Sequence, residues 1–239
     1  MVIKDPIILR QLQARQNWIR PADGVRRAQA LKLFADGMPE VKGSRTWREH
    51  RFKKYFEDYQ AALFTYGIFA LGDYGPAEDF ECAYSYGEKV EPEDVPPFQD
   101  ADCFLRCKVN GELSYKPIQL KELPPQELAN RSTHQASLQG LIDGLDNRSY
   151  TAQAGREILV VAIYVNRLTT INLSELKMPS SLCIQQLWFF GQLDAQTGFV
   201  AGGNPRNSDS GGFATHHQFT MPVWNPASGL TATGTDPYA

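Results

Sequence analysis

The sequence predicts an α/β fold in which helices pack against a mixed β-sheet. Three observations predict it. Apolar side chains recur at helical intervals over residues 52–66. Asn110-Gly111 is a strong hairpin turn signal between two strand-like segments. Residues 158–165 form a nearly continuous apolar, β-branched run, which is typical of a strand covered on both faces. An order of helices, three strands, helix, strand, short helix and strand implies a mixed sheet with helices packed against it.

The first elements are expected to be helical. Two helices are expected before residue 36, because Pro21-Ala22-Asp23-Gly24 interrupts the apolar periodicity. A longer helix is expected to begin near Ser44 or Thr46, both good N-caps. Gly67 or Gly72 can supply its glycine stop.

The middle of the chain predicts a meander of strands. Residues 80–86 and 103–109 are typical strand segments, and an acidic, proline-containing loop joins them. With Asn110-Gly111 as the turn, the partner strand runs over about 112–123. Positions whose numbers sum to about 221 then lie opposite one another, so Asp102 is expected to face Gln119.

The remaining chain predicts a helix with an apolar stripe over 138–145, the strand over 158–165, a short helix near 173–177 and a strand over 182–190. From Gly198 the composition shifts towards glycine, serine, asparagine and proline. Three regions are expected, namely a basic helical region over 1–43, an α/β core over 44–200 and a C-terminal extension over 201–239.

Composition favours a globular protein of the cytoplasm. Of the 239 residues, 42% are hydrophobic and 11% aromatic. No apolar run approaches the roughly 18 residues needed to cross a bilayer, so no membrane association is expected. The N-terminus lacks the pattern of a signal peptide. The four scattered cysteines are expected to be reduced and buried.

Charge is distributed unevenly along the chain. Residues 1–54 hold 13 Lys and Arg against 5 Asp and Glu, although the whole chain has a net charge of −3. Such an excess suits a protein that handles phosphodiesters. Amphipathic helices that expose long basic side chains are the alternative explanation.

The strand around Gln119 carries the most suggestive chemistry. Residues two apart in a strand share a face, so Gln119 and Lys121 project together. Asp102 is expected about 5 Å from Gln119 across the hairpin. A carboxylate, an amide oxygen and the Leu120 carbonyl suit Mg²⁺, while Lys121 could orient or deprotonate an attacking water. The same residues also have purely structural explanations, in which Asp102 caps a turn and Lys121 pairs with Glu122 or Glu127 at a solvent-exposed edge of the sheet.

With these residues and this element order, the sequence resembles the PD-(D/E)xK nuclease superfamily, which has the restriction-endonuclease-like fold. The resemblance covers roughly residues 45–190. It implies that Asp102 and Gln119 bind Mg²⁺, or Mn²⁺ as the alternative, and that Lys121 is catalytic. It also implies a glutamate on the preceding helix, with Glu57 as the candidate and Glu49 as the alternative. In this divergent pattern Ala101 replaces the family's proline, and Gln119 replaces its usual acidic residue.

A basic segment with interleaved aromatics precedes these strands. Its cations could contact nucleic acid, and they are Arg45, Arg48, Arg51, Lys53 and Lys54. The alternative is an ordinary amphipathic helix. His216-His217 is favoured as a surface or core pair, since adjacent strand residues face opposite sides. The glycine-rich loop over 202–212 matches no phosphate-binding motif and is expected to be a connection.

The function expected from these features is Mg²⁺-dependent hydrolysis of phosphodiester bonds in DNA. A homodimer is a further expectation of the resemblance, because many such nucleases dimerise to cut two strands. Two alternatives stay open. One is a catalytically silent module of the same fold that binds DNA or a protein partner, and the other is a structural or assembly protein.

Overall fold

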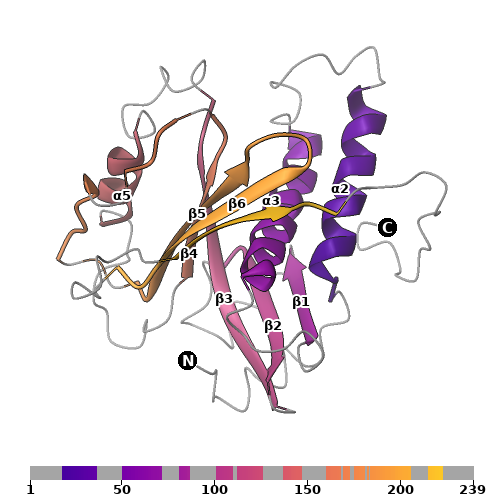
Figure 1. Cartoon of the computed structure of the whole chain (residues 1–239), viewed down its shortest axis with the longest axis horizontal. Coiled ribbons are helices and arrows are strands. Elements are labelled where there is room, and N and C mark those ends of the chain that lie inside the picture. The colour runs from indigo at the N-terminus through magenta and orange to yellow at the C-terminus, as the bar shows by residue number, and fades with distance from the viewer. Residues whose placement is uncertain are drawn as a thin grey trace.

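The computed structural model describes residues 18–36, 50–71, 81–86, 101–109, 112–125, 137–146, 160–167, 169–172, 175–180, 182, 184–205 and 215–222. The helices in this part are α2 (Pro21–Asp36), α3 (His50–Ala70) and α5 (Leu138–Asp146). The strands are β1 (Glu81–Tyr86), β2 (Cys103–Val109), β3 (Glu112–Leu123), β4 (Val160–Val165), β5 (Gln186–Gln192), β6 (Thr197–Gly203) and β7 (Thr215–Thr220). Figure 1 shows their arrangement.

The seven strands form one mixed sheet whose spatial order follows the chain from β1 to β7. Strands β1, β2 and β3 form an antiparallel meander. Strands β3, β4 and β5 are parallel neighbours, and β6 and β7 are again antiparallel. The expected α/β class with a mixed sheet is therefore confirmed.

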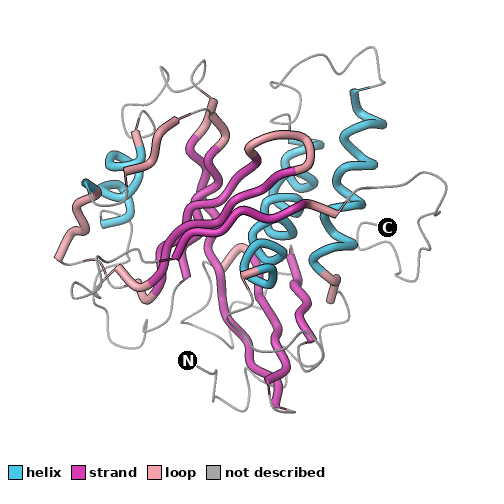
Figure 2. Tube along the Cα trace, viewed as in Figure 1, coloured by secondary structure: helices cyan, strands magenta, loops and turns pink. Residues whose placement is uncertain are grey.

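Two hydrophobic cores lie on opposite faces of the sheet, as the separation of the helices in Figure 2 shows. The first core joins α2 and α3 to one face, where alternate residues of the strands point towards the helices. Its strand residues include Cys103, Leu105, Ile118, Leu120, Ala162, Tyr164 and Phe190. The second core joins α5 to the other face, and its strand residues include Leu123, Val161, Ile163, Leu187 and Phe189. Alternation along each strand thus decides which helix layer a side chain meets.

The central hairpin has the bounds and the register expected from its turn. Strands β2 and β3 run over Cys103–Val109 and Glu112–Leu123. Cys103 pairs with Ile118 and Val109 pairs with Glu112, so partner numbers sum to 221. The period-two pattern and the Asn-Gly turn are local features, which is why the sequence predicts them well.

The expected helix boundaries need two corrections. The second expected helix, α2, already begins at Pro21, so Pro21-Ala22-Asp23-Gly24 is its first turn, where the Gly24 N–H donates to the Arg20 carbonyl at 3.0 Å. The first expected helix lies outside the described residues. Proline suits the first helical position because no intrahelical acceptor is needed for its missing N–H. Gly67 does not end α3, which continues to Ala70. The starts expected at Ser44 and Thr46, and the stop at Gly72, lie outside the described residues.

Gly67 is a packing position rather than a helix stop. A Cβ atom there would lie 2.7 Å from Cε1 of Phe219, a buried residue of β7. Gly198 of β6 is equally close to the same ring, with a Cβ position 2.5 Å from Cζ. The two glycines therefore allow the Phe219 side chain to lie between α3 and β6.

The two C-terminal strands of the sheet were not predicted from the sequence. Strand β6 runs over Thr197–Gly203 and β7 over Thr215–Thr220, so the boundary expected at residue 200 falls inside β6. The strand expected over 182–190 is shifted to Gln186–Gln192. Glycine has a low strand propensity, which hides β6 in the sequence. Of the short helix expected at 173–177, residues 173 and 174 lie outside the described part. Glu175 has 3₁₀ conformation, its N–H donating to the Asn172 carbonyl at 3.2 Å, and residues 176–177 are not helical.

Helix α2 belongs to the same packed body as α3. Val25 is fully buried in the core shared with α3 and the sheet. The Arg27 guanidinium forms an ion pair with the Asp58 carboxylate of α3, and Asp58 is only 3% exposed. Residues near the boundary expected at 43 lie outside the described part. Within the described residues, no helix combines the length and the apolar character that crossing a membrane would require.

Candidate functional site

The candidate site lies at Ile118 of β3, where pairing with β2 on one edge of the strand ends and pairing with β4 on the other edge begins. Strand β2 begins at Cys103, opposite Ile118, and Ile118 is also the first residue of β3 that pairs with β4. From Gln119 onward, no strand in the described part of the chain pairs with the side of β3 that β2 had occupied. Backbone groups on that side need another partner, because unpaired buried backbone groups are costly.

Asp102 supplies that partner. Its backbone N–H donates to the Ile118 carbonyl at 2.9 Å, and its carboxylate Oδ2 accepts a hydrogen bond from the Leu120 N–H at 2.7 Å. Leu120 is the middle residue of Gln119-Leu120-Lys121. The carboxylate is thus held against the backbone of the proposed motif, while Asp102 as a residue remains exposed. The alternative role expected for Asp102, capping a turn, is similar to this arrangement. Here, however, the N–H group that Asp102 caps belongs to Leu120 in a strand.

Gln119 and Lys121 project to the face that carries α5. Ile118 and Leu120 lie in the core beneath α3, so the alternating residues point the other way. Gln119 is 8% exposed, and Lys121 is half-buried. The β2–β3 pairing ends with Cys103 opposite Ile118, so Asp102 and Gln119, which were expected to face one another, are the next residues along the two chains. Asp102 and Gln119 are therefore close to one another where β2 and β3 separate, with Lys121 two residues further along β3. This place in the sheet, formed by Asp102, Gln119 and Leu120, is called the Asp102 fork below.

Glu57 lies at the same end of the sheet but beneath its other face. It follows Phe56 on α3, and the Phe56 ring lies 5.7 Å from the Tyr164 ring, measured between centroids. Tyr164 pairs in register with Glu122, the residue after Lys121. Since α3 packs against the face opposite Gln119 and Lys121, the structure separates Glu57 from them by the thickness of the sheet. The alternative, Glu49, lies outside the described residues.

The basic segment is described only in part. Arg45 and Arg48 lie outside the described residues. Arg51, Lys53 and Lys54 belong to the first two turns of α3, and the positions of their side chains are outside the described part. The contact between Phe56 and Tyr164 nevertheless places the beginning of α3 beside the carboxyl ends of β3 and β4.

The donor set for a metal is small. Among the described residues, no three His, Cys, Asp or Glu side chains gather as metal ligands would. Asp102 contributes one carboxylate, Gln119 one amide oxygen, and Leu120 a backbone carbonyl. In an extended strand the N–H and C=O of one residue point to the same side, so the Leu120 carbonyl projects towards Asp102. One carboxylate with neutral oxygens fits Mg²⁺, which usually keeps several waters.

Tyr164, which is buried, and Tyr59, which is partly buried, lie on the opposite face near the same strand ends. Burial, with a smaller contribution from the Glu122 carboxylate, raises the pKa of Tyr164 far above its ordinary value. Burial likewise raises the pKa of Tyr59, and Tyr164 adds to this effect. Glu122 accepts a 2.9 Å hydrogen bond from Asn166 Nδ2. These groups stabilise the α3 face and do not contribute to the Asp102 fork.

The cross-strand pair of Arg106 and Tyr115, on the same face as Gln119, was not predicted from the sequence. Arg106 pairs in register with Tyr115, and both alternate with residues of the α3 core. The Arg106 guanidinium lies over the Trp18 ring, 4.7 Å from its centroid. The hairpin register could have predicted the pair of Arg106 and Tyr115. Nothing in the sequence points to Trp18, which reaches the hairpin only through the tertiary fold.

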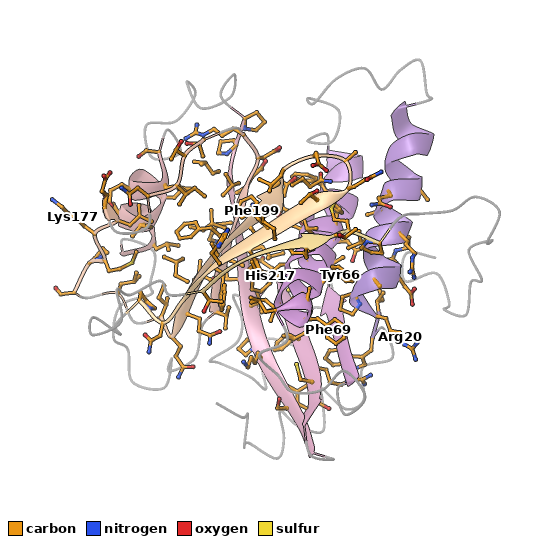
Figure 3. The ribbon with its side chains drawn as sticks, in the orientation of Figure 1. Arg20, Tyr66, Phe69, Lys177, Phe199 and His217 are labelled. Atoms are coloured by element: carbon orange, nitrogen blue, oxygen red, sulfur yellow. The ribbon has the colours of Figure 1, made fainter. Side chains whose placement is uncertain are left out.

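The other residues singled out from the sequence lie elsewhere in the sheet. His216 and His217 are on β7, and His217 stacks on Phe219 with 6.5 Å between ring centroids. The Phe219 ring also lies 5.6 Å from the Tyr66 ring of α3, and Figure 3 labels Tyr66 and His217 in this region. Cys103 and Cys107 are buried and form no disulfide bond, as expected. Part of the loop over 202–212 belongs to β6, which ends at Gly203.

Comparison with protein families gives no match for this chain, and the same holds for comparison with curated proteins and with solved structures.

Proposed function

We propose that this protein is a Mg²⁺-dependent nuclease with a restriction-endonuclease-like core that hydrolyses phosphodiester bonds in DNA. The observation that carries the proposal is the hydrogen bond from the Leu120 N–H to the Asp102 carboxylate. It joins the expected metal-binding aspartate to the middle residue of the Gln-x-Lys strand. Two residues that are distant in sequence thereby form one polar site at a fork in the sheet.

The order of elements supports the same proposal. Helix α3 precedes three antiparallel strands, α5 follows, and β4 then pairs in parallel with β3. This is the helix, three strands, helix and strand order that the resemblance implies. The site lies on the third strand, at the point where pairing with β2 on one edge ends and pairing with β4 on the other edge begins.

The chain's own residues would divide the chemistry among them. Asp102, Gln119 and the Leu120 carbonyl would hold Mg²⁺, which when bound would neutralise charge that develops on the phosphate. Lys121 would orient the attacking water and take part in moving its proton. The cation of Lys121 would also stabilise negative charge on the phosphate oxygens. Basic residues at the start of α3 would contact the nucleic-acid backbone beside this edge.

Metal-dependent cleavage by a lysine variant tests the proposal. Supercoiled plasmid is incubated with wild-type protein, Lys121→Ala and Lys116→Ala, in Mg²⁺, in Mn²⁺ and in EDTA. Lys116 is the matched control, because it lies on the same strand but points to the other face. We expect wild type and Lys116→Ala to nick the plasmid with either metal, and Lys121→Ala to lose at least 100-fold in rate. Cleavage by Lys121→Ala at the wild-type rate would contradict the proposal.

A catalytically silent module of the same fold is the second candidate. Gln119 favours it, because an amide lacks the negative charge that usually strengthens metal binding at this position. In that case the wild-type protein would bind DNA in EDTA, with an affinity that falls steeply as salt rises. It would show no cleavage with either metal.

A further inference from the structure

Two of the four cysteines occupy opposite positions in the sheet. Strands β1 and β2 are antiparallel neighbours, and Cys82 of β1 pairs in register with Cys107 of β2. In an antiparallel pair, residues in register have Cα atoms about 4.5 or 5.5 Å apart, depending on whether they exchange hydrogen bonds. Disulfide bonds join residues whose Cα atoms lie about 4.4–6.8 Å apart. Both separations therefore fall within the range that a disulfide spans.

Cys103, the other cysteine of β2, has no cysteine opposite it. It pairs in register with Tyr86 of β1 on one side and with Ile118 of β3 on the other. It is also four residues from Cys107 on the same strand, which corresponds to about 13 Å and is too far for a disulfide. Among the described strands, the β1–β2 pair is therefore the one place where two cysteines are in register.

The burial of Cys107 limits the route by which it can be oxidised. Cys107 belongs to the core beneath α3 and is only 1% exposed. A reagent in solution does not react with a thiol that is buried in this way. Directly opposite residues of an antiparallel ladder share a face, so Cys82 occupies the same face of the sheet. A sulfur in register needs no access from solvent to bond with Cys107, so an oxidant has to enter through Cys82.

Cys82 lies on the edge strand of the described sheet. The spatial order of strands begins with β1, and β2 is the one described strand that pairs with it. Figure 1 shows β1 beyond β2, on the side away from β3. A strand held by a single ladder opens locally at a lower free-energy cost than a strand paired on both sides. Local opening of β1 admits a small oxidant to Cys82 while β2 to β7 stay paired.

We propose that Cys82 and Cys107 form a reversible disulfide that fastens the edge strand β1 to β2 under oxidising conditions. The oxidant is a small disulfide of the glutathione type, and the step is thiol–disulfide exchange. The Cys82 thiolate attacks one sulfur of the reagent, which forms a mixed disulfide and releases one thiolate. The Cys107 thiolate then attacks the Cys82 sulfur and releases the second. Two protein thiols become one disulfide, one reagent disulfide becomes two thiols, and the two protons pass to the released thiolates.

The bond affects both the unfolded and the folded chain. It encloses residues 83–106, which include Asp102. Such a cross-link lowers the conformational entropy of the unfolded chain and thereby stabilises the folded protein. In the folded protein it adds a covalent connection to the single ladder that holds β1. Neither DNA nor a metal takes part, so the disulfide is independent of the proposed nuclease function.

Disulfide mapping tests the pairing. Full-length protein is incubated with oxidised glutathione in native buffer, the remaining thiols are blocked with N-ethylmaleimide, and tryptic peptides are analysed by mass spectrometry without reduction. Trypsin cuts after Arg106, so Cys103 and Cys107 fall on separate peptides and their links to Cys82 differ in mass. We expect the Cys82–Cys107 link in the wild type and in Cys103→Ser, and its loss when dithiothreitol is added.

Two results of this mapping would overturn the proposal. In one, the Cys82 and Cys107 peptides of the native wild type stay unlinked although both link to other cysteines when the protein is oxidised in 8 M urea. In the other, Cys82 of the native protein bonds to a different cysteine. Both results are read from the wild type, so they do not depend on the folding of a variant.

Stability and hydrogen exchange test the effect on β1. Oxidised wild-type protein is expected to melt about 5–10 °C above the reduced protein. The amides of Glu81–Tyr86 should exchange about tenfold more slowly after oxidation, because opening of β1 is restricted. Cys103→Ser should respond to oxidation like the wild type, whereas Cys82→Ser, a change on the edge strand, should not respond. Equal melting temperatures and equal exchange rates in the reduced and the linked wild type would overturn the fastening of β1.

Discussion

The Leu120 N–H donates to the Asp102 carboxylate beside the point where β2 begins, at a distance of 2.7 Å. The acceptor is exposed and lies outside the strand, whereas Leu120 is part of the buried core under α3. One hydrogen bond therefore connects the core of the sheet to a carboxylate at its surface. Asp102 thus has two roles. It accepts a hydrogen bond from the backbone of β3, and it positions an anionic oxygen near Gln119, so the two roles can be separated by substitution.

Replacing Asp102 should separate structure from chemistry. Asp102→Ala removes the acceptor for the Leu120 N–H and should lower the free energy of unfolding by about 1 kcal/mol. Asp102→Asn keeps an acceptor oxygen but removes the charge, so its stability should fall by less than half of that amount. Both variants should lose DNA cleavage. Urea unfolding and plasmid nicking measure the two effects, and full nicking activity in Asp102→Asn would contradict a metal-binding role.

Restoring a carboxylate at Gln119 should strengthen metal binding. Gln119→Glu adds a negative charge near Asp102, and the Mg²⁺ concentration for half-maximal cleavage should fall about tenfold, which corresponds to about 1.4 kcal/mol. Gln119→Leu is the control that removes the oxygen donor. Because position 119 is 8% exposed in the native protein, burial should raise the pKa of the new carboxyl, so the gain should shrink as pH falls. An unchanged Mg²⁺ requirement in Gln119→Glu would argue against this site.

The ring of Phe219 should make Gly67 intolerant of a methyl group. Alanine normally stabilises a helix interior by about 1 kcal/mol relative to glycine, but here its Cβ would press on Phe219. Overpacking costs about 1–3 kcal/mol, so Gly67→Ala should be destabilising on balance. Gly144→Ala is the matched control, since no atom lies within 4 Å of its Cβ position on α5. It should stabilise the protein by about 1 kcal/mol.

Urea unfolding of both glycine variants tests this packing. The double variant Gly67→Ala with Phe219→Leu should lose less stability than the two single changes predict together, because a smaller side chain relieves the contact. If Gly67→Ala were as stabilising as Gly144→Ala, the close approach of α3 and β7 at Phe219 would be wrong.

Stability should fall in alkaline solution because of Tyr59 and Tyr164. Burial raises the pKa of both phenols above the ordinary value of 10.0. In the unfolded chain they ionise near pH 10, whereas the folded protein keeps them protonated. Their contribution is therefore complete below pH 10 and is lost as pH rises above it, by about 1.4 kcal/mol per pH unit for each group.

Urea unfolding between pH 8 and pH 11 measures this loss. Tyr164→Phe keeps the ring and should reduce the alkaline slope by about one proton equivalent. The double variant with Tyr59→Phe should reduce it further. An alkaline slope that is the same in the double variant and in the wild type would exclude these tyrosines as its source.

Local patterns were sufficient for the hairpin and for the position of Asp102. The Asn-Gly turn sets the β2–β3 register, which ends with Cys103 opposite Ile118 and so brings Asp102, the preceding residue, close to this part of β3. Features that depend on distant neighbours were not predictable in this way. Gly67 resembled a helix stop because only the packing of Phe219 shows why a glycine is needed within α3. Strand β6 was missed because its glycines lower strand propensity, and pairing with β5 and β7 outweighs that preference.

The sequence by itself determined the α/β class, the bounds of the central hairpin and the alternation that turns Gln119 and Lys121 to one face. These properties follow from interactions between residues that are near in the chain, through turn geometry and the two-residue period of a strand. The tertiary structure decided which helix covers each face of the sheet and that Glu57 lies on the face opposite Gln119 and Lys121. It also decided that Trp18 stacks on Arg106. These properties depend on contacts between distant segments, which are settled only when the whole sheet buries both of its faces.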